Sequence, residues 1–106
     1  MFKEIYRNKK LLSAARDCPH CMMCQKHNDG TIVAAHYQGL RQHSLGKGTG
    51  IKPTDSATAF ICSHCHDKVD GRMNWHIIDK TERSEEFLFA IVQTHDWLLK
   101  EGIFNV

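Results

Sequence analysis

The residues with the strongest chemical signal lie in one short segment, from Cys62 to Asp70. Cys62 and Cys65 are separated by two residues, a spacing that lets both thiolates bind one tetrahedral metal ion from a single turn. The residues after such a pair often begin a helix, and on a helix His66 and Asp70 are four positions apart and share one face. An imidazole and a carboxylate in this arrangement can chelate a second divalent ion. The segment therefore predicts one structural and one chemically active metal site.

A second group of cysteines precedes this segment and supplies the remaining ligands of a four-thiolate site. Cys18, Cys21 and Cys24 form two overlapping pairs with the same two-residue gap. We predict a structural zinc site built from Cys21, Cys24, Cys62 and Cys65, with Cys18 left open as a substitute in the first pair. Unligated buried thiols are the alternative, but such thiols do not usually occur as two pairs of this spacing.

The elements that must position these residues follow one another in the order strand, loop, strand, helix. The segment from Thr31 to Tyr37 is β-branched and apolar, and it places His36 near the end of a strand. Asp55 to Ile61 predicts a second strand leading into Cys62, and a helix is expected from about Ser63 to Arg72. The result is a ββα unit held together by zinc.

The segment between the two strands, residues 38–54, is rich in glycine and predicts a loop. It lacks the residue order of a nucleotide-binding phosphate loop, so we expect no nucleotide cofactor. Backbone amides and basic side chains in such a loop can hold a nucleic-acid backbone, although a plain connector has the same composition. The candidate nucleic-acid-binding residues are Arg41, Lys47 and Lys52.

Two further helices are expected on either side of the ββα unit. The N-terminal helix is predicted over about residues 9–16. The C-terminal helix is predicted over about residues 82–100, where apolar residues recur at helical spacing and acidic residues occupy the first turn. We predict a single domain over residues 1–106 with its core at about residues 18–72, and we expect the last helix to cover that core.

Composition narrows the class of protein. The 106-residue chain has a net charge of +2 and a pI of about 8.3, which is too mildly basic to indicate a nucleic-acid binder by itself. There is no run of 18 apolar residues and no signal-peptide pattern, so we expect a soluble cytoplasmic protein without a membrane partner. In a reducing cytoplasm the five cysteines are expected to act as metal ligands rather than to form disulfides.

Taken together, these features resemble the HNH, or ββα-metal, nuclease superfamily. The chain more closely resembles the small phage and prophage nucleases of the YbcO type, and more distantly the phage recombination enhancement nuclease. The motifs that carry the resemblance lie within about residues 10–72, and they are Ala34-Ala35-His36, Gly46-Lys47-Gly48-Thr49-Gly50-Ile51-Lys52, Asp55 and Cys62-x-x-Cys65-His66-x-x-x-Asp70-Gly71. The implied fold class is α+β, a zinc-stapled ββα-metal domain similar to a treble clef, with flanking helices.

The resemblance implies metal-dependent hydrolysis of DNA phosphodiester bonds. His36 takes the place of the general base, and His66 and Asp70 take the places of ligands to a catalytic Mg²⁺, Mn²⁺, Ni²⁺ or Zn²⁺ ion. Asp55 lies near the place of the family's central polar residue, which orients the loop that bears the base. Ala35 stands where many members have a metal-binding Asp, so the ion would have few protein ligands. The implied partners are DNA and phage or host recombination proteins, in the cytoplasm of a bacterial host.

The residue types fit this chemistry independently of the resemblance. Phosphodiester hydrolysis needs a base that works near neutral pH, which histidine supplies, and a cation to neutralise the developing negative charge. The competing hypothesis is a non-catalytic zinc ribbon that binds nucleic acid or a protein, in which His66 and Asp70 are ordinary helix-surface residues. The sequence leaves open DNA against RNA, sequence preference and oligomeric state.

Overall fold

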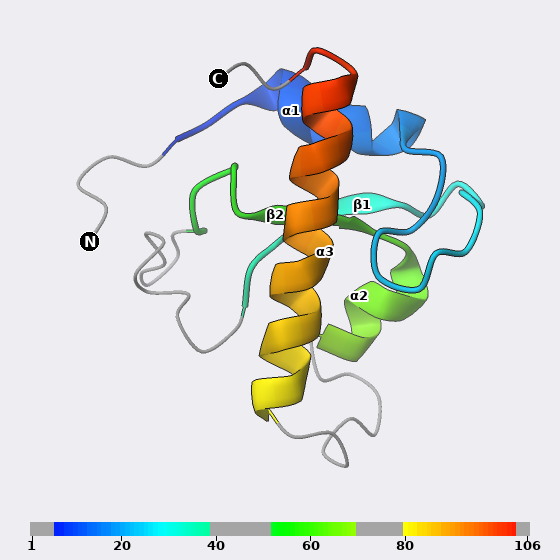
Figure 1. Ribbon diagram of the computed structural model, residues 1–106, viewed down its shortest axis with the longest axis vertical. Coiled ribbons are helices and arrows are strands. Elements are labelled where there is room, and N and C mark those ends of the chain that lie inside the picture. Colours follow the sequence, from blue (N-terminus) through cyan, green and yellow to red (C-terminus); the bar gives the residue numbers. More distant parts are fainter. Residues whose placement is uncertain (1–5, 39–51, 70–79, 104–106) are drawn as a thin grey trace.

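A computed structural model of the chain describes residues 6–38, 52–69 and 80–103 (Figure 1). These residues form a small α+β structure with a two-stranded antiparallel sheet and three α-helices. In chain order the elements are α1 (Lys9–Ser13), the 3₁₀ helix η1 (Ala14–Asp17), β1 (Val33–His36), β2 (Thr58–Ile61), α2 (Ser63–Val69) and α3 (Lys80–Lys100). The predicted order of strand, strand and helix is therefore present, with a helix on each side.

The sheet is shorter than the sequence predicted. β1 and β2 pair so that Val33 lies opposite Ile61 and His36 lies opposite Thr58. The predicted second strand began at Asp55, but a turn takes up its first three residues. The Ala57 N–H donates to the Thr54 carbonyl at 3.0 Å, and the Thr58 hydroxyl donates to the Asp55 carbonyl at 3.0 Å. This turn brings the Asp55 side chain beside the end of β1 instead of placing it in the ladder.

The outer edge of β2 is closed by groups from two other parts of the chain. The Phe60 N–H donates to the Thr94 hydroxyl of α3 at 3.0 Å, and the Phe60 carbonyl accepts from the Met22 N–H at 2.9 Å. The Thr94 hydroxyl in turn donates to the Ala90 carbonyl, also in α3. A buried strand edge needs such partners, because an unpaired backbone group away from water costs about 1–3 kcal/mol. The edge bonds therefore fix α3 and the cysteine-bearing loop against the sheet.

The hydrophobic core lies between α3 and the sheet and continues to α1. All four residues of β2 are buried, and α3 packs against this strand (Figure 1). The Tyr37 and Phe87 rings meet edge to face with their centroids 5.5 Å apart. Burying a large apolar side chain of this kind contributes about 1.5–3 kcal/mol. The largest fully buried side chains are Tyr37, Phe60, Phe87, Leu11, Ile61 and Leu98.

The helix boundaries follow from local chemistry. At the N-terminal helix, the Asn8 side chain accepts from the Leu11 N–H at 3.1 Å and caps α1. The predicted helix over residues 9–16 tightens into η1 and stops before Cys18, which is extended because Pro19 follows it. At the other end, α3 closes with Gly102 at a φ of 71°. The Ile103 N–H bonds to the Leu98 carbonyl there, as in a Schellman motif.

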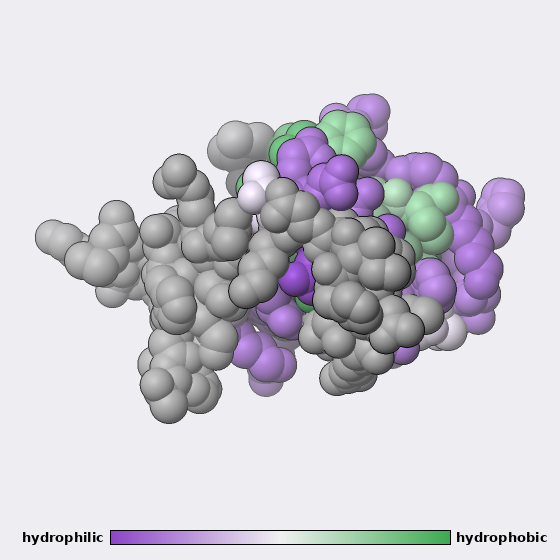
Figure 2. Space-filling model, turned by 90° about the horizontal axis from the view of Figure 1, so that it is seen from below, coloured by the Kyte–Doolittle hydropathy of each residue, from purple (hydrophilic) through white to green (hydrophobic). Residues whose placement is uncertain are grey.

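Two of the predicted helices differ in length from those observed. The C-terminal helix, predicted over residues 82–100, begins at Lys80 and ends at Lys100. The helix predicted over residues 63–72 is observed as α2, Ser63–Val69, and the rest of its predicted length lies outside the described residues. Among the described residues, no helix combines the length and the apolar character needed to cross a membrane. From below, the described surface is mostly hydrophilic, with its hydrophobic residues in separate patches (Figure 2).

Candidate active site and metal centre

Four cysteine thiols converge where the sheet meets α2. Cys21 and Cys24 come from the loop before β1, Cys62 follows β2, and Cys65 lies in α2. Their sulfur atoms all lie within 4.8 Å of one another, with 3.7 Å between Cys21 and Cys65 and 3.9 Å between Cys24 and Cys62. Four sulfurs bound tetrahedrally to zinc at about 2.3 Å are about 3.8 Å apart. The four thiols therefore fit a structural metal ion.

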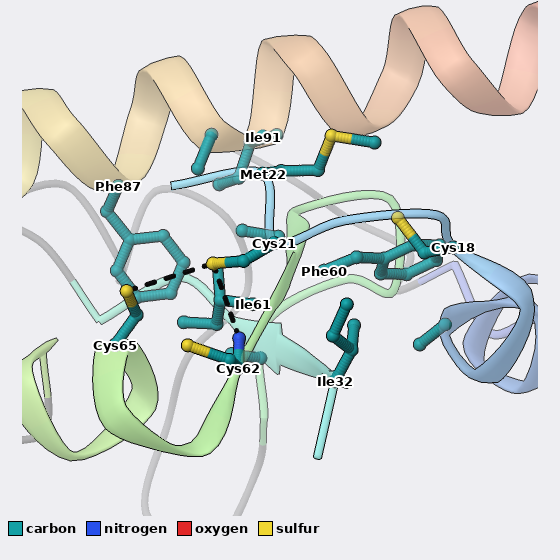
Figure 3. Packing of buried hydrophobic residues seen from close by; sticks show 14 of the residues in the cluster. Cys18, Cys21, Met22, Ile32, Phe60, Ile61, Cys62, Cys65, Phe87 and Ile91 are labelled. Carbon is teal, nitrogen blue, oxygen red and sulfur yellow. Dashed lines mark hydrogen bonds between the residues drawn. The ribbon is translucent and has the colours of Figure 1, made fainter. Parts of the chain in front are cut away.

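The backbone around Cys21 prepares its sulfur to be a thiolate. Cys21 Sγ accepts hydrogen bonds from the N–H groups of Met23, Cys24 and Cys62, each at 3.4 Å. Figure 3 shows the bond from Cys62 and the one between Cys21 and Cys65. The hydrogen bond between Cys21 and Cys65 and these backbone donors together lower the pKa of Cys21 to about 4, against the effect of burial. A thiolate is the form that binds metal, so these hydrogen bonds favour the ligating form of Cys21.

Cys18 lies apart from this cluster (Figure 3). Its side chain is fully buried in the core, and its thiol donates to the His20 carbonyl at 3.2 Å. Burial raises the pKa of Cys18, which favours the neutral thiol. Of the two pairs that the sequence left open, the structure brings Cys21 and Cys24 to the second pair of cysteines and places Cys18 among apolar residues.

His36, at the end of β1, forms a pair with Asp55. The distance from His36 Nε2 to Asp55 Oδ1 is 2.8 Å. Asp55 also accepts from the Asn8 backbone N–H at 2.7 Å and from Arg7 at 3.0 Å. Burial by itself would raise the pKa of Asp55, but the hydrogen bonds from His36, Asn8 and Arg7 outweigh it, so the pKa of this carboxyl lies below its usual value. An ionised carboxylate only accepts hydrogen bonds, so the proton of the pair belongs on His36 Nε2.

Arg7 is a site residue that sequence reasoning missed. Besides Asp55, its guanidinium donates to the Pro53 carbonyl at 2.6 Å and to the Lys52 carbonyl at 2.8 Å. It therefore ties the segment before β2 to the N-terminus and holds Asp55 toward His36. In the sequence Arg7 is one of several basic residues near the N-terminus, and no local pattern separates it from a solvent-exposed cation because its partners are 45 to 48 positions away.

One pocket brings together the two histidines predicted to carry the chemistry. It has a volume of about 480 Å³, and its lining includes His36 from β1, His66 from α2 and Lys52. The His36 side chain is 13% exposed, so the imidazole is held by its surroundings yet reachable from the pocket. The other predicted site residues, Asp70, Arg41 and Lys47, lie outside the described residues.

The Asp55 network leads to a prediction about stability. Asp55→Asn keeps the side-chain shape but removes the charge beside Arg7 and His36, and we expect it to lower the free energy of unfolding at pH 7 by about 1–3 kcal/mol. The pKa of Asp55 is lower in the folded protein than in the unfolded chain. The contribution of the Asp55 charge to the free energy of unfolding is therefore fully present above the unfolded-state pKa of about 3.9, and it is lost as pH falls through the folded-state pKa. Urea unfolding of both proteins at several pH values measures the difference.

Two comparisons make that measurement specific. Both proteins carry the same cysteine cluster, so the effect of acid on the thiolates cancels in the difference between them. Asp17→Asn, at an exposed position in η1, should change stability by no more than about 0.5 kcal/mol. A wild-type advantage over Asp55→Asn that declined steadily between pH 8 and pH 5 would contradict the depressed pKa.

The geometry defines a small α+β protein with a cysteine cluster that is able to hold a metal ion. The cluster joins the two-stranded sheet to a helix. A pocket that contains the histidine of a histidine–carboxylate pair lies in the same structure. The family model described as "Putative nuclease YbcO" matches residues 10–103, and the chain belongs to this family. The resemblance to the YbcO type is thereby confirmed. The wider relations to the HNH superfamily and to the recombination enhancement nuclease remain predictions.

Individual relatives agree with this assignment. The chain is 39% identical over 78 residues to "Putative nuclease YbcO" of Escherichia coli (strain K12), a match that covers 74% of this chain and 75% of the relative. It shows the same identity and coverage to "Putative nuclease ybcO" of Enterobacteria phage 82. The solved structure described as "Structure of a putative bacteriophage protein from Escherichia coli str. K-12 substr. MG1655" has a TM-score of 0.60 and 28% identity, over 86% of this chain and 98% of that one.

Proposed function

We propose that this protein is an HNH-type, metal-dependent endonuclease that hydrolyses DNA phosphodiester bonds, with His36 as the general base. The observation that carries the proposal is the placement of His36, paired with Asp55 through Nε2, in the same pocket as His66. The names of the relatives, both described as nucleases, support the same activity.

The His36–Asp55 pair sets the chemistry of the base. With its Nε2 proton held by Asp55, a neutral His36 keeps the lone pair of its ring on Nδ1. This nitrogen can accept a proton from a water molecule that attacks phosphorus. As His36 becomes positively charged, the Asp55 carboxylate stabilises it, and Arg7 and Asn8 keep the carboxylate in place. The pair thus fixes both the tautomer and the orientation of the base.

His66 and the predicted ligand Asp70 are the residues that would hold a catalytic cation. His66 contributes an imidazole to the pocket from α2, and nitrogen ligands suit Mn²⁺, Ni²⁺ and Zn²⁺, while phosphate oxygens and water also suit Mg²⁺. When bound, the cation supplies neutralisation of the charge that gathers on the phosphoryl group and the leaving oxygen. The four cysteine thiols have a separate, structural role, since they join the loop before β1 to the β2–α2 junction.

The direct test is nicking of supercoiled plasmid by the purified, zinc-loaded protein. We expect cleavage only when Mg²⁺, Mn²⁺, Ni²⁺ or Zn²⁺ is added, and none in the presence of EDTA. The zinc content before and after each reaction shows whether the cysteine site stays loaded. If the folded protein cuts neither plasmid nor single-stranded DNA with any of these ions, the catalytic proposal is wrong, and the zinc ribbon that binds nucleic acid or a protein becomes the better hypothesis.

A further inference from the structure

A second pocket continues the candidate active site along β1. It has a volume of about 360 Å³ and shares Ala34, His36 and Lys52 with the pocket that contains His66. The two pockets have three lining residues in common and therefore lie side by side, and we call the pair the groove. Ala34 and His36 are two positions apart on a strand, so both side chains point to the same face of β1 and form part of the floor. At its far end the groove reaches Arg16 of η1.

The described lining of this groove contains basic side chains and no acidic ones. The basic side chains are Arg16, Lys52, His36 and His66, and none of the described lining residues is an aspartate or a glutamate. The nearby Asp55 carboxylate is buried beneath the site and already engaged by Arg7 and His36. An anion in the groove would therefore meet cations without competition from a carboxylate of the described lining.

Within the described part of the chain, Arg16 and Lys52 have no acidic partner. Neither forms an ion pair with any residue of the described ranges, although four other lysine and arginine side chains do. Those four ion pairs are Arg7–Asp55, Lys26–Asp29, Lys68–Glu86 and Lys100–Asp96. The two unpaired cations that line the groove are thus available to a ligand.

The backbones that carry these two cations are held in place. The Arg16 carbonyl accepts from the Asn28 side chain at 3.0 Å. The Lys52 carbonyl accepts from Arg7 at 2.8 Å. The small side chain of Ala34 also lines the second pocket. Two separate cations with anchored backbones suit an extended chain of negative charges better than a single small anion.

We propose that Arg16 and Lys52 form a phosphate-binding site next to the candidate active site, which holds the backbone of a DNA strand beside the scissile phosphate. The proposal rests on the proposed function and extends it, since the strand would run from His66, past His36, toward Arg16. Arg16 and Lys52 contact phosphates and not bases, so they position the strand without reading its sequence. The substrate is then an internal phosphodiester of a polynucleotide, because the two cations would bind phosphates other than the scissile one.

The test measures DNA binding without added divalent ions, so that it does not depend on cleavage. The affinity of a labelled DNA is determined at several salt concentrations for wild type, Arg16→Gln, Lys52→Gln and the control Lys9→Gln. Lys9 is an exposed cation on α1 that does not line the groove. We expect each groove variant to reduce the slope of log affinity against log salt by about 0.9 for duplex DNA, or about 0.7 for a single strand, with no such change for Lys9→Gln.

The duplex and single-strand arms also show which form of DNA occupies the groove. Equal slopes for Arg16→Gln, Lys52→Gln and Lys9→Gln would overturn the proposal, as would a wild-type protein that binds neither form of DNA. Zinc content and thermal unfolding of each variant exclude a general loss of structure. If the slopes change as expected but no ion supports cleavage, the groove is a binding site and the proposed nuclease activity is wrong, so the two failures are distinguishable.

Discussion

Replacing His36 by alanine should lower the rate of plasmid cleavage by about 10²- to 10⁴-fold, because a positioned general base contributes a factor of this size. This loss corresponds to roughly 3–5 kcal/mol of activation free energy. The fold should survive, since the His36 side chain is partly exposed to the pocket and does not belong to the buried core. Cleavage is measured over a range of protein concentrations with the divalent ion that best supports the wild type.

A matched variant and two structural readouts make the result interpretable. His27→Ala removes an exposed histidine that does not line the described pocket, and it should cleave like wild type. His36→Ala should retain the wild-type zinc content and still unfold cooperatively, with a stability loss no larger than that of Asp55→Asn. Undiminished cleavage by zinc-loaded His36→Ala would remove His36 from its role as the base. Equal losses in both histidine variants would indicate a general effect of histidine removal and would also contradict the assignment.

Removing the metal from the cysteine cluster should have the largest effect on stability. Structural zinc contributes about 10–16 kcal/mol in zinc-finger peptides, which is comparable to the whole free energy of unfolding of a typical domain, about 5–15 kcal/mol. We expect Cys65→Ser to lose its zinc and its cooperative thermal unfolding transition, because Cys65 is 1% exposed and its sulfur lies beside that of Cys21. Zinc stoichiometry and thermal unfolding followed by circular dichroism measure both effects.

Cys18 provides the matched control for the cluster. Like Cys65 it is a buried cysteine, but its thiol donates to a backbone carbonyl and does not face the other four sulfurs. Cys18→Ala should therefore keep one zinc ion per chain and lose only the stability expected for a small core truncation. If Cys18→Ala lost its zinc while Cys65→Ser kept it, the assignment of the four ligands would be wrong.

Much of the local structure could be predicted because it depends on neighbouring residues. The two-residue gap between cysteines brings their sulfurs together within one turn. Apolar residues at helical spacing from Phe87 to Leu98 define the buried side of α3, and Gly102 ends the helix through its positive φ. The strand boundaries were less accurate. The turn at Asp55 to Ala57 is stabilised by hydrogen bonds from Ala57 and Thr58. The β-propensity of these residues does not reflect such bonds, so the predicted strand began three residues too early.

The sequence by itself determined the kinds of chemistry available to this protein: two cysteine pairs able to hold one metal ion, and a histidine at the end of an apolar strand. Only the tertiary structure decided which groups meet. In the folded protein Cys24, and not Cys18, lies in the cysteine cluster. Asp55 contacts His36, and Arg7 from the N-terminal segment donates to the same carboxylate. The physical reason is distance along the chain. Spacing within one turn fixes relative positions directly, whereas contacts between residues 19 to 48 positions apart depend on how the helices pack against the sheet.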